Sequence, residues 1–246
     1  MGNFGTYISE PEGLSADELR QWRRERCALG YRVLASSRWG ELGDGHITAR
    51  DPEKLDHFWL LRYDVPFGEA SADDMVLVGP DGQAVDPSIT INNAAYYIHS
   101  PVLAARPDVV SAVHTHTPYG TPWSAFVEPL RMVSQESTAF HGEQAVWDNE
   151  MVDVLDMVSG KDLAANLGDN KLLILRNHGN LTVGASIDEA VGWFILAERA
   201  AEANVKAHDG GKPISDEAAA YAAKSMAGVG SALQVFTWTA RSRGLL

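Results

Sequence analysis

Residues 171–202 read KLLILRNHGNLTVGASIDEAVGWFILAERAAE, and this stretch decides the fold class. Its first part, 171–184, has two apolar runs around a glycine, which predicts a strand, a turn and a second strand. Ser186 and Glu189 form a capping-box pattern, so a helix is expected to begin directly after the second strand. Apolar side chains then recur at helical spacing on one face of that helix. Two strands followed by an amphipathic helix indicate a layered α/β protein.

The rest of the chain alternates irregularly between helix and strand patterns. Helices are expected at about 15–37, 91–109, 150–167 and in the tail after residue 208. Strands or shorter extended pieces are expected at 57–61, 75–82, 109–116, 129–136 and 142–148, and turn formers dominate 40–53. We therefore expect an α/β fold with a central, mainly antiparallel or mixed sheet. No Pro-, Gly- or Ser-rich linker and no repeat divides residues 1–246, which predicts a single domain.

Composition limits the classes of function. The chain has 246 residues, of which 45% are apolar and 22% charged, as in ordinary soluble globular proteins. Its formal net charge of −13 argues against a nucleic-acid or anionic-membrane partner. It has no leader pattern and no apolar run long enough to span a membrane. Cys27 is the only cysteine, which excludes an intrachain disulfide and suits a reducing cytoplasm.

Histidines are concentrated at the ends of two predicted strands. His114 and His116 lie two positions apart in SAVHTHTPYG, and in a strand such side chains share a face about 7 Å apart. His178 is the natural third ligand, because Gly179 lets the backbone pass close to an ion. Three imidazoles with an open position suit a catalytic divalent metal. The alternative is that His-x-His is a pair of polar side chains near a strand end and that His178 is a structural turn residue.

Four further histidines are not expected to be ligands. His99 is expected on a helix near the site, His57 and His141 in solvent, and His208 in a loop. Aromatic residues near the histidine motifs are compatible with an aromatic substrate, although most aromatic side chains serve the core.

Three stretches together carry a family resemblance: GDGHITAR at 43–50, AARPDVVSAVHTHT at 104–117, and the opening stretch. In this order and at this spacing they resemble the class II aldolase/adducin family over about residues 20–205. The resemblance implies an α/β/α fold, usually a homotetramer with the active site near a subunit interface. It also implies one divalent metal per chain, Fe(II), Zn(II) or Mn(II), held by His114, His116 and His178. The tail, about 206–246, lies beyond the resemblance and is expected to be helical.

The chain departs from the family pattern where aldolases carry their base and bind phosphate. Counting back from His114 by the family's spacing gives Ala95 in place of the glutamate that serves as metal ligand and general base. Asn93 and Ala94 stand where phosphate-binding serines are expected, and His46 replaces an asparagine of the phosphate loop. The departures imply that sugar phosphates are poor substrates.

A finer similarity narrows the expected chemistry. WRRERCALGYRVL at 22–34, RWGELGDGHITARDP at 38–52 and FWLLRYDV at 58–65 resemble the bacterial adducin-like branch. That branch includes the non-haem iron proteins of aminocoumarin antibiotic biosynthesis. It implies a metal-dependent enzyme that acts on a carbon–carbon bond, decarboxylating or oxidatively decarboxylating a small aromatic or 2-oxo or 2-hydroxy acid. His46 and Glu136 are the candidate catalytic residues, the latter as a carboxylate that acts near the metal.

Two other functions remain open on the sequence. One is an aldolase that acts on an unphosphorylated aldehyde or ketone, and the other is a non-catalytic adducin-like binding module. An oxygenase would need iron or a similar redox metal. Three imidazoles leave room for a bidentate acid and O₂ on a six-coordinate ion.

Overall fold

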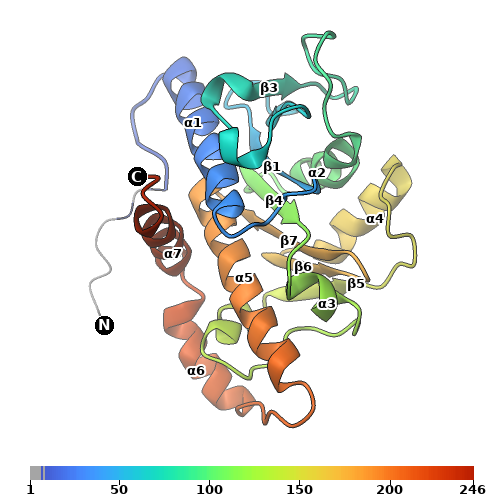
Figure 1. The fold of residues 1–246 in the computed structure, drawn as a ribbon, viewed down its shortest axis with the longest axis vertical. Helices are drawn as coiled ribbons and strands as arrows, with labels where there is room; N and C mark the ends of the chain where they lie inside the picture. The colour runs from blue at the N-terminus through green and yellow to red at the C-terminus, as the bar shows by residue number, and fades with distance from the viewer. Residues whose placement is uncertain (1–6, 8) are drawn as a thin grey trace.

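The computed structural model describes residue 7 and residues 9–246, and the described residues form one seven-stranded sheet (Figure 1). The strand order is β3-β2-β1-β4-β7-β6-β5. Every neighbouring pair is antiparallel except β5 with β6, which confirms the expected mixed sheet. The strands are β1 Gly45–Arg50, β2 Phe58–Leu61, β3 Met75–Val78, β4 Ser111–Thr115, β5 Gln144–Trp147, β6 Leu172–Leu175 and β7 Gly179–Gly184.

Helices cover both faces of this sheet and give three layers (Figure 1). Helices α2 and α4 pack on one face, and α1, α5 and α7 pack on the other. This arrangement confirms the expected α/β/α architecture. The helices are α1 Ala16–Ala35, α2 Asn93–Ala105, α3 Gly120–Ser124, α4 Met157–Leu167, α5 Ile187–Ala207, α6 Asp216–Met226 and α7 Val229–Ser242. Short 3₁₀ turns are η1 Phe67–Glu69, η2 Ala72–Asp74 and η3 Glu136–Phe140.

Side chains cap the two helices whose starts the sequence marks. At α1 the capping box is complete, since Ser15 Oγ accepts from the Glu18 N–H and Glu18 accepts from the Ser15 N–H. At α5 Ser186 accepts from the Glu189 N–H, but the Glu189 carboxylate accepts from Ala185 N and Trp193 Nε1 instead. The second box is therefore half formed, and α5 still begins where the pattern predicts.

Four segments have a different secondary structure, or begin at a different residue, from what the sequence predicted. Residues 45–50, inside the turn-rich segment, form β1, because ladders with β2 and β4 on both sides outweigh local turn propensity. Segment 129–136 contains no strand and leads into η3. Helix α4 begins at Met157, where Asp156 caps it, and the tail contains two helices.

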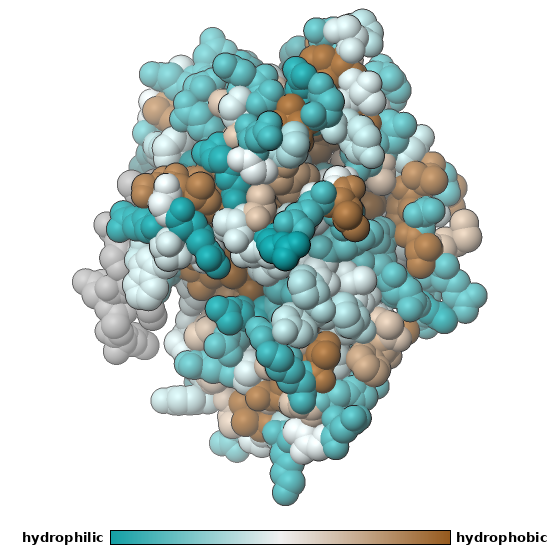
Figure 2. All heavy atoms as spheres, viewed as in Figure 1, coloured by the Kyte–Doolittle hydropathy of each residue, from teal (hydrophilic) through white to brown (hydrophobic). Residues whose placement is uncertain are grey.

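Gly45 is needed where β1 meets β4. Its φ of 137° lies outside the range that side chains favour, and a Cβ there would lie 2.6 Å from the His114 carbonyl oxygen. The backbone of β1 can therefore approach the histidine-bearing strand closely. None of the described helices is long and apolar enough to cross a membrane. Polar side chains cover most of the face in Figure 2, and apolar ones form separate patches.

Candidate metal centre

Three histidines converge where β4 ends and β7 begins. His114 lies in β4 and His116 follows it, while His178 occupies the turn between β6 and β7. Because β4 pairs with β7, this turn lies beside the end of β4. One nitrogen atom from each imidazole lies within 4.8 Å of the others. The structure thus brings together the three residues that the sequence analysis grouped, and we call them the histidine cluster.

Backbone geometry presents His178 to the other two rings. Asn177 and Gly179, on either side of it, have φ values of 55° and 147°. The φ of Gly179 lies in the region that favours glycine, whereas a Cβ there would make only an ordinary contact of 3.7 Å with the His114 ring. Glycine is therefore favoured at this position by its backbone conformation.

A hydrogen bond orients one of the imidazoles, and a carboxylate lies close to a second. His114 Nδ1 donates to the Asn180 carbonyl at 2.9 Å, which leaves Nε2 unprotonated and free to bind a metal. His116 Nδ1 lies 3.3 Å from the Asp44 carboxylate. His178 Nδ1 is buried and has no hydrogen-bond partner among the described residues. Three imidazoles, two with second partners and one with a buried free nitrogen, fit the requirements of a zinc- or iron-type ion.

Burial keeps two of these imidazoles neutral. It lowers the pKa of His114 well below the ordinary value, and the neighbouring imidazoles act in the same direction. Burial likewise lowers the pKa of His178 to about 4, against an opposing effect of the Asp153 charge. Neutral imidazole is the form that binds metals, so both residues are ready to act as ligands near neutral pH.

A second group of polar side chains lies behind His114. His46 pairs with His114 across the β1–β4 ladder, and their ring centroids are 5.2 Å apart. His46 Nδ1 lies 2.7 Å from His99 Nε2, and His99 Nδ1 lies 2.6 Å from Thr48 Oγ1. All three side chains are buried. We call this group, Thr48, His99 and His46, the histidine relay.

The place of His99 in this relay was expected, but its hydrogen bonds were not. His99 lies on α2 near the site, as the sequence analysis expected. Its bonds to two β1 residues were not predicted, because they join positions 53 and 51 residues apart. The only local signal is that His46 and Thr48 share one face of a strand.

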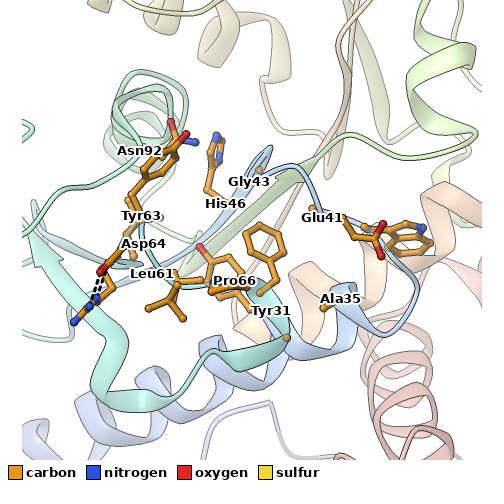
Figure 3. A pocket seen from close by; sticks show the side chains of 18 residues that line it. Tyr31, Ala35, Glu41, Gly43, His46, Leu61, Tyr63, Asp64, Pro66 and Asn92 are labelled. Carbon is orange, nitrogen blue, oxygen red and sulfur yellow. Dashed lines mark hydrogen bonds and ion pairs between the residues drawn. The ribbon is translucent and has the colours of Figure 1, made fainter.

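A hollow of about 410 Å³ adjoins the relay (Figure 3). It ends at His46 and Asn92, so the histidine cluster lies one imidazole ring away and does not itself line the hollow. Aromatic and aliphatic side chains line much of it, Glu41, Arg62 and Asp64 add charged groups, and we call it the aromatic hollow. Its wall residues include Tyr31, Trp39, Leu61, Tyr63, Pro66 and Phe67.

Glu136 lies elsewhere. It is the first residue of η3 and lines a separate hollow with Arg199 of α5 and Trp238 of α7. The structure does not bring it to the histidine cluster, because the segment before η3 does not run along the sheet and η3 packs against α5 and α6. Asp44 and Asp153 are the carboxylates that act on the cluster, and no sequence pattern marks either of them.

By the family's spacing, Ala95 stands where the aldolases carry a glutamate, and the structure gives its surroundings. Ala95 lies on α2, is fully buried and belongs to the apolar core between α2, α4 and the sheet. It contributes a methyl group only. The position that carries a base in the family's aldolases therefore has no acid–base capacity here.

The fold agrees with the comparison with known families. The Class II Aldolase and Adducin N-terminal domain matches residues 25–205, and the chain belongs to this family. Among its relatives, the Decarboxylase NovR of Streptomyces niveus is 33% identical over 198 residues, covering 80% of this chain and 73% of that protein. The 4-hydroxy-3-prenylphenylpyruvate oxygenase/4-hydroxy-3-prenylbenzoate synthase of Streptomyces roseochromogenus subsp. oscitans is 34% identical over 206 residues, covering 82% and 74%.

A solved structure is similar over almost the whole chain. The L-fuculose 1-phosphate aldolase from Glaciozyma antarctica PI12 superposes with a TM-score of 0.87 and 30% identity. The superposition covers 99% of this chain and 98% of that one. The similarity to this aldolase therefore includes the tail helices α6 and α7, which lie beyond the residues that the family domain matches.

Proposed function

We propose that this chain is a metal-dependent enzyme that breaks a carbon–carbon bond beside a carboxylate. Its substrate is a small aromatic or 2-oxo or 2-hydroxy acid, which it decarboxylates, oxidatively when the metal is iron. The observation that carries the proposal is the histidine cluster beside a hollow with aromatic walls. The two relatives add support, because their names are those of a decarboxylase and of an oxygenase for a phenylpyruvate.

His114, His116 and His178 would hold one divalent ion per chain, Fe(II), Zn(II) or Mn(II). When bound, the ion supplies positive charge to a carboxylate and its neighbouring oxygen, and iron adds redox chemistry with O₂. The Asn180 carbonyl orients one of the three imidazoles, and the Asp44 carboxylate lies close to a second. We extend to this chain the homotetramer and the cytoplasmic location that the family resemblance implies.

The absent glutamate favours decarboxylation over aldol chemistry. Aldol cleavage needs a group that takes and returns a proton, and the methyl group of Ala95 cannot do so. Loss of CO₂ removes no proton from carbon. The electron pair left on that carbon must then take up a proton from solvent or, in the oxidative reaction, pass to O₂, which a bound iron would activate.

An aldolase that acts on an unphosphorylated aldehyde or ketone is the second candidate. The similarity to the Glaciozyma aldolase over nearly the full chain favours it. Asn93 and Ala94 at the start of α2 provide no hydroxyl groups for a phosphate, which is why the substrate would lack one. We therefore expect poor cleavage of L-fuculose 1-phosphate.

The test compares metals and substrates on protein purified without chelators. Samples reconstituted with Fe(II), Zn(II) or Mn(II) are assayed for CO₂ release from phenylpyruvate and mandelate, with O₂ uptake recorded in parallel. We expect O₂-dependent CO₂ release with iron. Equal turnover with zinc under nitrogen would remove the oxygenase and keep the decarboxylase. Cleavage of an unphosphorylated aldehyde or ketone would support the aldolase instead, and no turnover with any metal on acids and aldehydes would support a binding module. Efficient cleavage of L-fuculose 1-phosphate would contradict the expectation that sugar phosphates are poor substrates.

Two matched variants test the metal site. His178→Ala should lose bound metal, because it removes one of three ligands from the cluster. His141→Ala should retain the metal, because the His141 ring bonds the exposed Asp216 carboxylate and is not one of the cluster histidines. Metal per chain is measured by elemental analysis after gel filtration. Equal metal content in both variants would contradict the assignment.

A further inference from the structure

One end of the aromatic hollow presents two unused polar groups. His46 is only 2% exposed, its Nδ1 is engaged by His99, and its Nε2 has no partner among the described residues. Asn92 lies at the same end of the hollow (Figure 3). Its Oδ1 accepts from the Ala94 N–H, so the NH₂ of its amide is the part left over. Both residues line this end of the hollow and can each offer an N–H there, which makes it a place for a polar ligand atom.

The histidine relay determines where the His46 proton lies. Thr48 Oγ1 has no acceptor other than His99 Nδ1 within the described part of the chain, so its hydroxyl donates to that nitrogen. A neutral His99 then carries its proton on Nε2 and donates it to His46 Nδ1. A neutral His46 must therefore carry its own proton on Nε2, the nitrogen left free at the hollow.

Both rings lie in the interior, with His46 2% and His99 0% exposed, and their side-chain partners among the described residues include no carboxylate. A buried imidazolium without a counter-charge is disfavoured, so both rings are neutral.

We propose that Thr48 and His99 fix His46 as an N–H donor and that this donor, with the Asn92 amide, binds an oxygen atom of the substrate acid. The proposal rests on the proposed function and deepens it, because it assigns the carboxylate or keto oxygen a place beside the histidine cluster. His46 would contact the substrate directly. Thr48 and His99 are positioning residues that act through it.

The chemistry of the donors defines what this end of the hollow accepts. Two converging N–H donors match the two oxygens of a carboxylate and offer nothing to an ammonium group or another donor. His46 lies one ring from His114, so an acid held here has its oxygens next to the metal ligands. Its organic side group then has the aromatic hollow available.

The first part of the test reads the tautomer without any turnover. Zinc-loaded protein labelled with ¹⁵N-histidine is examined by long-range ¹H–¹⁵N NMR, which reports the protonated nitrogen of each ring. The His46 signals are assigned by their loss in His46→Gln. We expect protons on Nε2 of both His46 and His99. A His46 proton on Nδ1 would overturn the proposal.

The second part measures binding of phenylpyruvate to the zinc-loaded protein by calorimetry. His46→Phe, which removes the donor, should weaken binding about 10- to 100-fold, and His46→Gln, which keeps an amide N–H, should restore part of it. Thr48→Val should weaken binding several-fold and bring the two His46 nitrogen signals closer together, because the bias toward one tautomer is lost. Thr182→Val removes a buried hydroxyl elsewhere in the sheet, bonded to the Ala190 carbonyl, and should leave binding unchanged.

The outcomes separate this proposal from the proposed function. Unchanged binding in His46→Phe, with zinc content intact, would refute the substrate contact even if the protein decarboxylates oxo-acids. No binding of phenylpyruvate by the wild-type protein would overturn the oxo-acid substrate and the contact together, while a protonated Nε2 would still establish the fixed tautomer. If His46→Phe fails to fold, the wild-type spectrum and Thr48→Val decide the question.

Discussion

Mild acid should destabilise the metal-free protein because four imidazoles stay neutral in the fold. Burial is the largest cause of the lowered pKa in each: His46, His99, His114 and His178. In the unfolded chain each would titrate near the ordinary value of 6.5. Below that pH the unfolded state binds more protons than the folded state. The stabilising effect of neutrality is thus complete above pH 6.5 and is lost as the pH falls toward the folded pKa values.

The size of the effect follows from this difference in proton binding. Between pH 6.5 and 5.5, each histidine that is neutral only in the fold costs about 1 kcal/mol of unfolding free energy, and four cost about 4 kcal/mol. A typical domain has about 5–15 kcal/mol in total. The ordinary pKa values of carboxylates, 3.8 to 4.5, lie below this window. Burial raises the pKa of Asp188 and of Glu198, and a raised carboxyl pKa favours the folded state as the pH falls, so these two groups oppose the loss and do not cause it.

Urea unfolding of chelator-treated protein, followed by circular dichroism from pH 7.5 to 5.5, measures this loss. His99→Gln is the matched variant, since it removes one of the four groups and should reduce the pH-dependent loss by about 1 kcal/mol. A wild-type loss under about 1 kcal/mol between pH 6.5 and 5.5 would refute the reasoning. So would a loss of the same size in His99→Gln.

Three further substitutions test the placement of side chains outside the cluster. Glu136→Gln should leave metal content and CO₂ release within about twofold of wild type, because Glu136 lines a separate hollow; a loss of bound metal in elemental analysis would show that it acts at the site. Gly192→Ala should lower stability by about 2 kcal/mol in urea unfolding, since its Cβ would lie 2.1 Å from the Ala232 carbonyl oxygen where α5 meets α7. Asp188→Asn should cost about 3 kcal/mol, because it leaves the largely buried Arg26 guanidinium without the carboxylate it contacts at 2.8 Å; an unchanged urea midpoint would contradict this.

Periodic segments of the sequence were sufficient for most of the fold. Helix α5 and the β6–β7 pair follow from spacing and a capping residue, which are local properties. Strand β1 was missed because its stability comes from partners on both sides, β2 and β4, which local turn propensity does not reveal. The start of α4 was placed too early, although the capping residue Asp156 was available in the sequence.

The candidate site also contains some residues that local sequence patterns predict and others that only tertiary packing brings together. The three cluster histidines could be grouped because strand periodicity and a glycine turn constrain where their side chains lie. The relay could not be derived, since the bond between His46 and His99 depends on how α2 packs over β1. Glu136 was assigned to the site because it follows a predicted strand and precedes an aromatic segment. Its position instead follows from the packing of η3 against α5 and α6.

The buried position of Ala95 affects how this protein could change over evolution or by engineering. Ala95 and His99 are four residues apart on α2 and so share a helix face, and His99 is bonded into the sheet by two buried contacts. A glutamate introduced at position 95 would enter a closed apolar core and compete for room with that imidazole. One codon change would therefore yield an unstable protein before it yielded an aldolase. A glutamate at position 95 would require coordinated replacement of neighbouring residues. Core packing therefore prevents a single substitution from converting one kind of active site into the other.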